Sequence, residues 1–197
     1  METDQATKGR RGRKQPKKAT PAYLERAALF YLDRYATSAE NLRRVLQRKV
    51  VRSLRAHGGD PEEAEKAIDA LLTRFLDSGL LDDANYAETK ARSLFRRGLS
   101  QRSMRLWLAQ KGVGEEDIAA ALTKLQAEVG DPELAAALAY ARRRRLGPYR
   151  AEAEREAKRQ RDLAALARRG FTSDLVLKVI DAPAPTELEE EAAAAGL

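Results

Sequence analysis

The 197-residue sequence contains no cysteine, a single histidine and a single tryptophan, and only 6% of its residues are aromatic. Without cysteine the chain forms no disulfide and offers no thiolate to a metal or a substrate, as is usual in a reducing compartment. No apolar run approaches the roughly 20 residues that cross a bilayer. The segment from Met1 to Thr20 is basic and polar, unlike a secretory signal. We therefore expect a cytoplasmic protein that does not bind a membrane.

Motifs for catalysis and for cofactors are also missing. His57 lies in Ala-His-Gly-Gly at an expected helix end, where the helix dipole favours a charged imidazole. Asp82 and Asp83 directly precede an expected helix, and paired acids in that place are usually caps. No glycine-rich loop followed by lysine and serine or threonine is present to hold nucleotide phosphates. The sequence therefore predicts no catalytic residue, no cofactor and no metal site, and we expect the protein not to be an enzyme.

Positive charge, in contrast, is in excess. The chain has 37 lysine and arginine residues against 30 acidic residues, and its formal net charge is +7. Such an excess favours an anionic partner, either nucleic acid or an acidic protein surface. The alternative is that the charge reflects an alanine- and arginine-rich composition and serves no partner. The composition alone leaves both interpretations open.

Signals for the beginning and end of helices are frequent. Thr20-Pro21, Asp60-Pro61 and Asp131-Pro132 each place a capping side chain before a proline at the first helical position. Glycines such as Gly79 and Gly98 stand where a helix ends in a left-handed residue. These signals predict an all-α chain with helices over residues 21–35, 38–56, 61–78, 83–97, 101–111, 115–128, 132–145, 149–169 and 173–181.

The helices fall into repeating groups of three. Leu108-Ala109-Gln110-Lys111-Gly112-Val113 matches Leu166-Ala167-Arg168-Arg169-Gly170-Phe171 without a gap. Short helices bury little apolar area alone, so neighbouring groups are expected to stack. The pattern predicts an elongated array of three tandem three-helix repeats, over residues 20–78, 79–128 and 129–181. A basic arm at 1–19 and an acidic tail at 182–197 are too polar to fold and are predicted to be disordered.

These residues resemble the signature of the RecX regulatory family. The resemblance is carried by Gly79-Leu80-Leu81-Asp82-Asp83 with Tyr86-Ala87, by Arg92, by Gly98-Leu99-Ser100 and by the segment from Leu108 to Val113. It covers residues 22 to 181 and is strongest from Ile68 to Leu122. It implies a fold of three tandem three-helix repeats without a cofactor or a catalytic residue. The basic arm, the acidic tail and the long second helix depart from the usual family pattern.

The resemblance also implies a partner and a function. Members of the family bind the RecA recombinase, typically its filament on single-stranded DNA, and usually inhibit its ATPase and strand exchange. This implies a part in homologous recombination, DNA repair and the SOS response. The expected partners are the recombinase filament, single-stranded DNA and also duplex DNA, and we expect a monomer.

Basic residues in the second and third repeats are the candidate contacts with the recombinase or DNA. Residues three or four apart share a helix face, so Arg92 is expected to project with Arg96, and Arg102 with Arg105. Guanidinium groups bind phosphates and carboxylates. A solvated helix face is the alternative, and the run from Arg142 to Arg145 also suits the negative end of a helix dipole. The predicted binding residues are Arg92, Arg96, Arg97, Arg102, Arg105, Lys111, Arg142, Arg143, Arg144 and Arg145.

Two other functions compete with recombinase regulation. An independent DNA-binding protein would use pairs of short helices joined by glycine turns, in the manner of a helix-turn-helix protein. It predicts sequence-dependent binding of duplex DNA without a recombinase. An adaptor for an acidic protein would use the same basic faces, and its binding would survive nuclease treatment.

Overall fold

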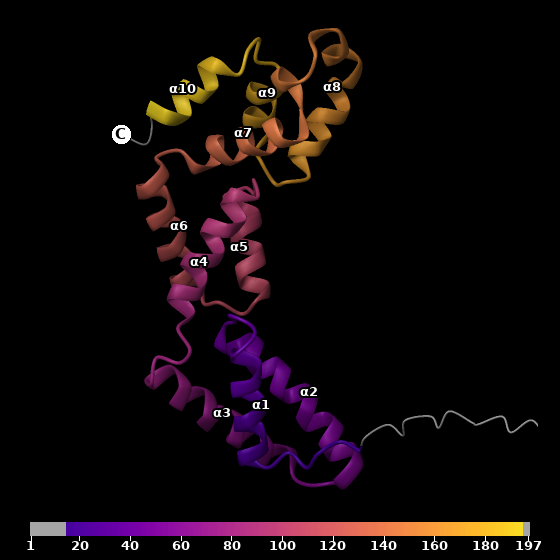
Figure 1. Cartoon of the computed structure of the whole chain (residues 1–197), viewed down its shortest axis with the longest axis vertical. Helices are drawn as coiled ribbons and strands as arrows, with labels where there is room; N and C mark the ends of the chain where they lie inside the picture. Colours follow the sequence, from indigo (N-terminus) through magenta and orange to yellow (C-terminus); the bar gives the residue numbers. More distant parts are fainter. Residues whose placement is uncertain (1–14, 195–197) are drawn as a thin grey trace, which may run out of the picture.

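In the computed structural model, which describes residues 15–194, the chain is an elongated array of helices (Figure 1). The first repeat lies at the lower end of Figure 1 and the third at the upper end. No strand occurs within the described residues, so the predicted all-α repeat fold is confirmed. The helices are α1 (Pro21–Leu32), α2 (Ala39–His57), α3 (Pro61–Asp77), α4 (Asp83–Arg96), α5 (Gln101–Gln110), α6 (Glu115–Val129), α7 (Pro132–Arg144), the 3-10 turn η1 (Gly147–Tyr149), α8 (Glu152–Ala167), α9 (Ser173–Ile180) and α10 (Thr186–Ala194).

Two edges of the array are built from different helices. In Figure 1, α2, α5 and α8 follow the right-hand side, which we call the second-helix edge. The helices α3, α6 and α10 follow the left-hand side, which we call the third-helix edge. The array bends so that α2 and α8 project from the second-helix edge on either side of α5. The two edges therefore present different sets of side chains to a partner.

Caps and prolines place the helix beginnings close to where the sequence predicts them. Asp131 accepts hydrogen bonds from the N–H groups of Glu133 and Leu134, each at 3.0 Å. Proline occupies the first position of α1, α3 and α7, where its missing N–H loses no hydrogen bond. The first helix ends at Leu32, three residues before the predicted end, because the chain must turn there to reach the cap of α2 at Ser38.

The buried apolar side chains form one cluster for each repeat. Burying a leucine or isoleucine side chain contributes about 1.5–3 kcal/mol, so these clusters stabilise the repeats one by one. Leu81, which the predicted boundary places in the second repeat, packs into the first cluster. Fully buried residues include Leu46 and Ile68 in the first cluster, Leu108 and Ile118 in the second, and Leu166 and Val179 in the third.

Hydrogen bonds at the beginning of α2 connect the first repeat to the second, at what we call the first joint. The Ser38 hydroxyl, at the beginning of α2, donates to the carbonyl of Lys111, at the end of α5. The backbone N–H of Ala39 donates to the carboxylate of Asp83 at 2.8 Å. The second helices of neighbouring repeats thus meet end to end.

The second joint repeats this arrangement with the corresponding residues. The Ser100 hydroxyl donates to the Arg169 carbonyl at 2.9 Å, and the N–H of Gln101 donates to the carboxylate of Glu133 at 2.8 Å. The C-terminus of α8 therefore meets the N-terminus of α5, as the C-terminus of α5 meets the N-terminus of α2. The negative end of one helix dipole lies next to the positive end of the next, which stabilises both joints.

The prediction of a disordered acidic tail at 182–197 is wrong for residues Thr186–Ala194, which form α10. This helix packs on α7 with Leu188 buried in the third cluster. The Tyr149 hydroxyl donates to the Glu189 carboxylate at 2.8 Å, and Lys178 forms an ion pair with Glu191 at 2.5 Å. The third helix of this repeat, α9, has only 8 residues against 15 in α6, so α10 covers the part of α7 that α9 leaves open.

Most of the basic arm predicted at 1–19 lies outside the described residues. Residues 15–19 have no regular structure and run beside the end of α2, where the N–H of Ala19 donates to the Ser53 hydroxyl at 2.8 Å. Within residues 15–194, no helix combines the length and the apolar character needed to cross a membrane.

Candidate functional site

Charge is separated between the two edges of the array. On the third-helix edge, α3, α6 and α10 each carry more acids than cations. On the second-helix edge, α8 mixes both signs, whereas α5 carries Arg102 and Arg105 without an acid. In α2 the single acid is Glu40, and the cations are Arg43, Arg44, Arg48, Lys49, Arg52 and Arg55. Because α2 and α5 are both cationic, a polyanion is attracted to the second-helix edge.

Two of the predicted binding residues meet at the second joint. Nη2 of Arg143 donates to the carbonyl of Arg97 at 2.7 Å. The guanidinium groups of Arg143 and Arg169 both face the ring of Tyr140, at 5.7 and 4.4 Å from its centroid. None of the three arginines forms an ion pair with another described residue. The joint therefore concentrates positive charge where the ends of α4, α7 and α8 meet.

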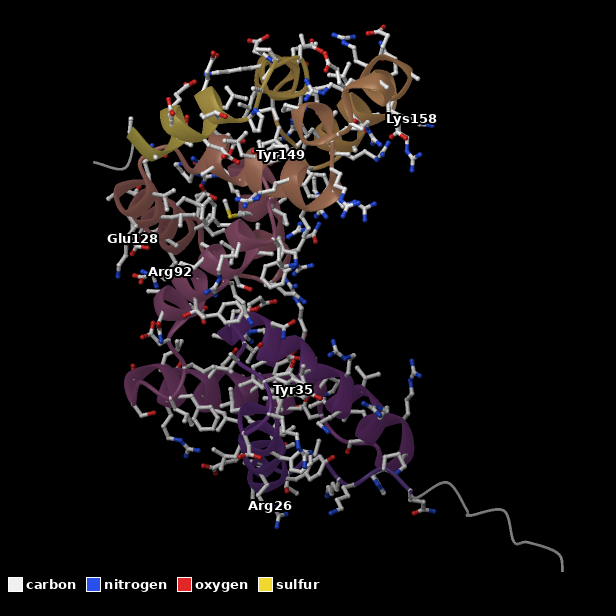
Figure 2. All side chains as sticks on the ribbon, turned by 45° about the horizontal axis from the view of Figure 1, so that its top comes forward. Arg26, Tyr35, Arg92, Glu128, Tyr149 and Lys158 are labelled. Carbon is white, nitrogen blue, oxygen red and sulfur yellow. The ribbon has the colours of Figure 1, made fainter. Side chains whose placement is uncertain are left out.

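Arg92 is engaged inside its own repeat. Its Nε donates to the carboxylate of Glu128 on α6 at 3.0 Å and its Nη2 to the same group at 2.5 Å. Its Nη2 also lies 3.8 Å from a carboxylate oxygen of Glu88. The hydrogen bond from Arg92 holds the pKa of Glu128 below its usual value. Figure 2 shows Arg92 and Glu128 together, away from Lys158 of the second-helix edge. The structure gives Arg92 a role in joining α4 to α6, and its contact with a partner stays a prediction.

The other predicted binding residues of the second repeat differ in their exposure and in their ion pairs. Arg96 and Arg102 are exposed and form no ion pair with a described residue. Arg105 forms an ion pair with Glu115 at the beginning of α6. Nζ of Lys111 lies 5.3 Å from the centroid of the half-buried Trp107 ring. Arg96 and Arg102 are thus open to an external anion, as Arg97 is.

The run from Arg142 to Arg145 circles the end of α7, and all four residues are exposed. Only Arg143 reaches the second joint. Arg142 instead lines a pocket between α7 and α10, together with Tyr149 and Glu189. Burial and the hydrogen bond to Glu189 raise the pKa of Tyr149. Arg145 ends the helix in the left-handed region, with φ of 53°. Four consecutive cations therefore do not face one partner.

Two sets of cations at the second-helix edge are not among the predicted binding residues. Arg169 follows α8 and joins the second-joint group only because α8 and α7 are packed side by side, which no local pattern indicates. The arginines of α2 could have been found, since Arg44, Arg48 and Arg52 recur four residues apart.

Two half-buried carboxylates, those of Asp83 and Glu133, lie at the two joints. Burial raises the pKa of Asp83 and of Glu133, but each accepts a backbone N–H at a joint. Among residues 15–194, no three histidine, aspartate or glutamate side chains are grouped so that they could hold a metal ion. The acids with a perturbed pKa therefore have a structural explanation.

The fold and the charge separation define an all-α repeat protein with one cationic edge, and comparisons with known proteins identify its family. The family model described as "RecX, second three-helix domain" matches residues 82–122. The regulatory protein RecX of Myxococcus xanthus (strain DK1622) is 46% identical over 175 residues, which cover 88% of this chain and 92% of that protein. The regulatory protein RecX of Agrobacterium fabrum is 30% identical over 159 residues, or 81% and 82% of the two chains. The chain belongs to the RecX family of regulatory proteins.

Solved structures support the same fold. The crystal structure of a regulatory protein RecX matches with a TM-score of 0.56 and 25% identity, over 81% of this chain and 70% of that chain. The crystal structure of RecX from Lactobacillus salivarius matches with a TM-score of 0.57 over 86% of this chain and 97% of that chain. At 20% identity, this second match concerns the fold alone.

Proposed function

We propose that this protein is a non-enzymatic regulator that binds the RecA recombinase filament on single-stranded DNA and inhibits its ATPase and strand exchange. Through this activity it affects homologous recombination, DNA repair and the SOS response. The recombinase is the partner implied by the family resemblance. The protein acts as a monomer, through non-covalent contacts made by its stacked repeats.

The observation that carries the proposal is the separation of charge along the array. The cationic edge runs through more than one repeat, so it can contact acidic side chains and phosphates of several filament subunits at once. Each exposed ionic contact is weak alone, and an array that engages many of them gains affinity through their number. A protein lodged along the filament in this way obstructs ATP turnover and the entry of a homologous duplex.

Within this proposal the predicted residues have different roles. Arg96 and Arg102 are exposed, form no ion pair with a described residue, and contact the filament directly. Arg97 and Arg143 act with Arg169 as the group at the second joint. Arg92 contributes mainly by holding α6 against α4.

The test is the single-stranded-DNA-dependent ATPase of the cognate RecA filament, titrated with the wild-type protein and with two double variants. In the first variant, Arg96→Gln and Arg102→Gln remove two exposed cations of the second repeat. In the control, Arg26→Gln and Lys66→Gln remove the same charge from exposed positions of the first repeat. We expect inhibition by the wild type and by the control, and weaker inhibition by the first variant.

Three results would each overturn a part of this proposal. If the wild type leaves ATP turnover unchanged at low salt, the protein is not an inhibitor of the filament. If turnover is unchanged while the protein binds one duplex sequence much more tightly than others, the independent DNA-binding function is favoured instead. Equal inhibition by both double variants would move the contact away from Arg96 and Arg102.

A further inference from the structure

The exposed face of α2 carries a line of arginines. Arg44, Arg48, Arg52 and Arg55 recur three or four residues apart, so they share one face, and we call them the α2 stripe. All four are exposed. Each interval of four residues advances about 6 Å along a helix. The stripe therefore presents charges of one sign at near-regular spacing along the part of α2 that projects from the array (Figure 1).

The protein itself neutralises little of this stripe. Arg44 forms an ion pair with Glu40 at 3.0 Å and donates to the carbonyl of Gln110 at 2.8 Å, which ties one end of the stripe to the first joint. Arg48, Arg52 and Arg55 form no ion pair with another described residue. Three guanidinium groups are thus open to an anion from outside.

The chain that precedes α1 extends the cationic surface. The N–H of Ala19 donates to the Ser53 hydroxyl at 2.8 Å, and a ring nitrogen of His57 lies 2.6 Å from the carbonyl oxygen of Pro16. These contacts hold the exposed pair Lys17-Lys18 at the C-terminal end of α2. The arm therefore joins the stripe where α2 ends.

We propose that the α2 stripe, together with Lys17 and Lys18, binds the phosphate backbone of duplex DNA without reading its sequence. Protein interfaces usually centre on an aromatic or another large anchor, and among the arginines of the stripe the exposed apolar residue is Val51. Single-strand sites stack bases on aromatic rings, and α2 contains no phenylalanine, tyrosine or tryptophan. Duplex DNA presents about one negative charge per 1.7 Å of its axis, a higher charge density than that of a single strand. It is therefore the better target for a line of cations.

This contact deepens the proposed function, because it adds a duplex-binding surface in the first repeat to a protein that we propose binds a recombinase filament. None of its residues is among the binding residues predicted in the second and third repeats. It also needs no recombinase, so its test and the ATPase test fail independently.

The experiment measures binding of the full-length protein to a fluorescent duplex of arbitrary sequence, by anisotropy, at salt concentrations from about 50 to about 200 mM. The test variant carries Arg48→Gln and Arg52→Gln. The control carries Arg26→Gln and Lys66→Gln, which lowers the net charge equally at exposed positions of α1 and α3. A third variant, Arg48→Lys with Arg52→Lys, keeps the charge. Circular dichroism melting verifies that all variants fold.

We expect the test variant to lower the slope of log affinity against log salt by about 2, because each lost phosphate contact removes about 0.9. The control and the lysine variant keep the slope of the wild type, and other duplex sequences give the same result. Equal slopes for the test variant and the control would overturn the proposal. A larger loss for a single strand than for the duplex would overturn the duplex assignment. If the test variant keeps its affinity for DNA but loses binding to polyglutamate, the partner of the stripe is an acidic protein and not DNA.

Discussion

The Ser100 hydroxyl donates to the carbonyl of Arg169 at 2.9 Å and also accepts a hydrogen bond from the N–H of Ser103 at 3.1 Å. One side chain thus caps its own helix and binds the end of the next repeat. Ser38 does the same at the first joint, where its hydroxyl accepts from the N–H of Asn41. A hydroxyl suits this position because it both donates and accepts. The stacking of the repeats therefore depends on the caps of the second helices.

Adding a methyl group at Gly170 should open the second joint. Gly170 has φ of +87°, and a Cβ there would lie 2.5 Å from Oγ of Ser103 and 2.6 Å from Oγ of Ser100. We expect Gly170→Ala to lower the free energy of unfolding by about 2–4 kcal/mol, from backbone strain plus the lost serine hydrogen bonds. The matched control is Gly79→Ala, which has φ of +71° and no atom within 4 Å of the added Cβ. It should cost only about 1–2 kcal/mol, for the backbone alone. If the two variants lose equal free energy of unfolding in urea denaturation, the close contacts of Gly170 with the two serines do not stabilise the second joint.

The carboxylates at the joints should make stability fall as the pH rises. Burial raises the pKa of Asp83, so the folded protein holds this proton more strongly than the unfolded chain. Stability is then lost as the pH rises from the unfolded value, about 3.9 for aspartate, through the higher folded value. Asp83→Asn keeps an oxygen to accept the Ala39 N–H but does not titrate. We expect the variant to gain stability relative to the wild type as the pH rises through this window.

This pH dependence is measured by urea denaturation from about pH 4 to about pH 7. The control is the substitution Glu116→Gln. Glu116 is an exposed acid in the first turn of α6 and takes no part in either joint. Glu133→Gln should behave like Asp83→Asn, because burial also raises the pKa of Glu133 at the second joint. Parallel curves for Asp83→Asn and the wild type would show that the carboxylate is not desolvated by the joint.

Much of the fold follows from local sequence patterns. The match between the segments ending α5 and α8 indicates equivalent helix ends, and Leu108 and Leu166 are indeed both fully buried. The helix in the acidic tail is not predictable in this way. Pro183 and Pro185 are typical of the end of a folded region, and the glutamates that follow are typical of a solvated segment. This helix depends on the packing of Leu188 against α7, which is a contact between distant parts of the chain.

The site was less predictable than the fold. A helix pattern shows which cations share a face, but it does not show which acid of another helix lies opposite. Arg92 was predicted to face a partner, and the packing of α4 on α6 brings Glu128 to it instead. Arg97 and Arg143 were predicted separately, and only the second joint brings them together.

Arg92 and Glu128 should act as one unit that stabilises the second repeat. We expect Arg92→Gln and Glu128→Gln to lower the melting temperature by similar amounts, and the double variant to melt no lower than the worse single variant. Inhibition of the recombinase ATPase should be kept by all three at temperatures where they are folded. A loss of inhibition by Arg92→Gln with an unchanged melting temperature would instead make Arg92 a contact with the partner.

Truncating Leu188 should release α10 without unfolding the array. Leu188 is 6% exposed and is the buried residue of this helix. Leu188→Ala should cost at most about 2 kcal/mol, because α10 detaches locally instead of leaving a full cavity. We expect faster hydrogen exchange and proteolysis within Thr186–Ala194 and over the face of α7 that it covers. Leu106→Ala, at a residue that is 56% exposed, should change neither. Unchanged exchange in Leu188→Ala would mean that the polar contacts alone hold α10.

Asp162 should be the acid whose loss most destabilises the third repeat. Its side chain is 1% exposed, and its carboxylate accepts from the N–H of Gly147 at 3.0 Å and from Nε and Nη2 of Arg150 at 3.1 and 2.9 Å. Asp162→Ala leaves a buried N–H and a half-buried guanidinium without this partner, so we expect a loss of about 3–5 kcal/mol in urea denaturation. Glu154→Ala removes the other carboxylate near Arg150, which is exposed, and should cost no more than about 1 kcal/mol. Similar losses in the two variants would show that burial of Asp162 adds nothing to its ion pair, and that η1 is held by its apolar contacts instead.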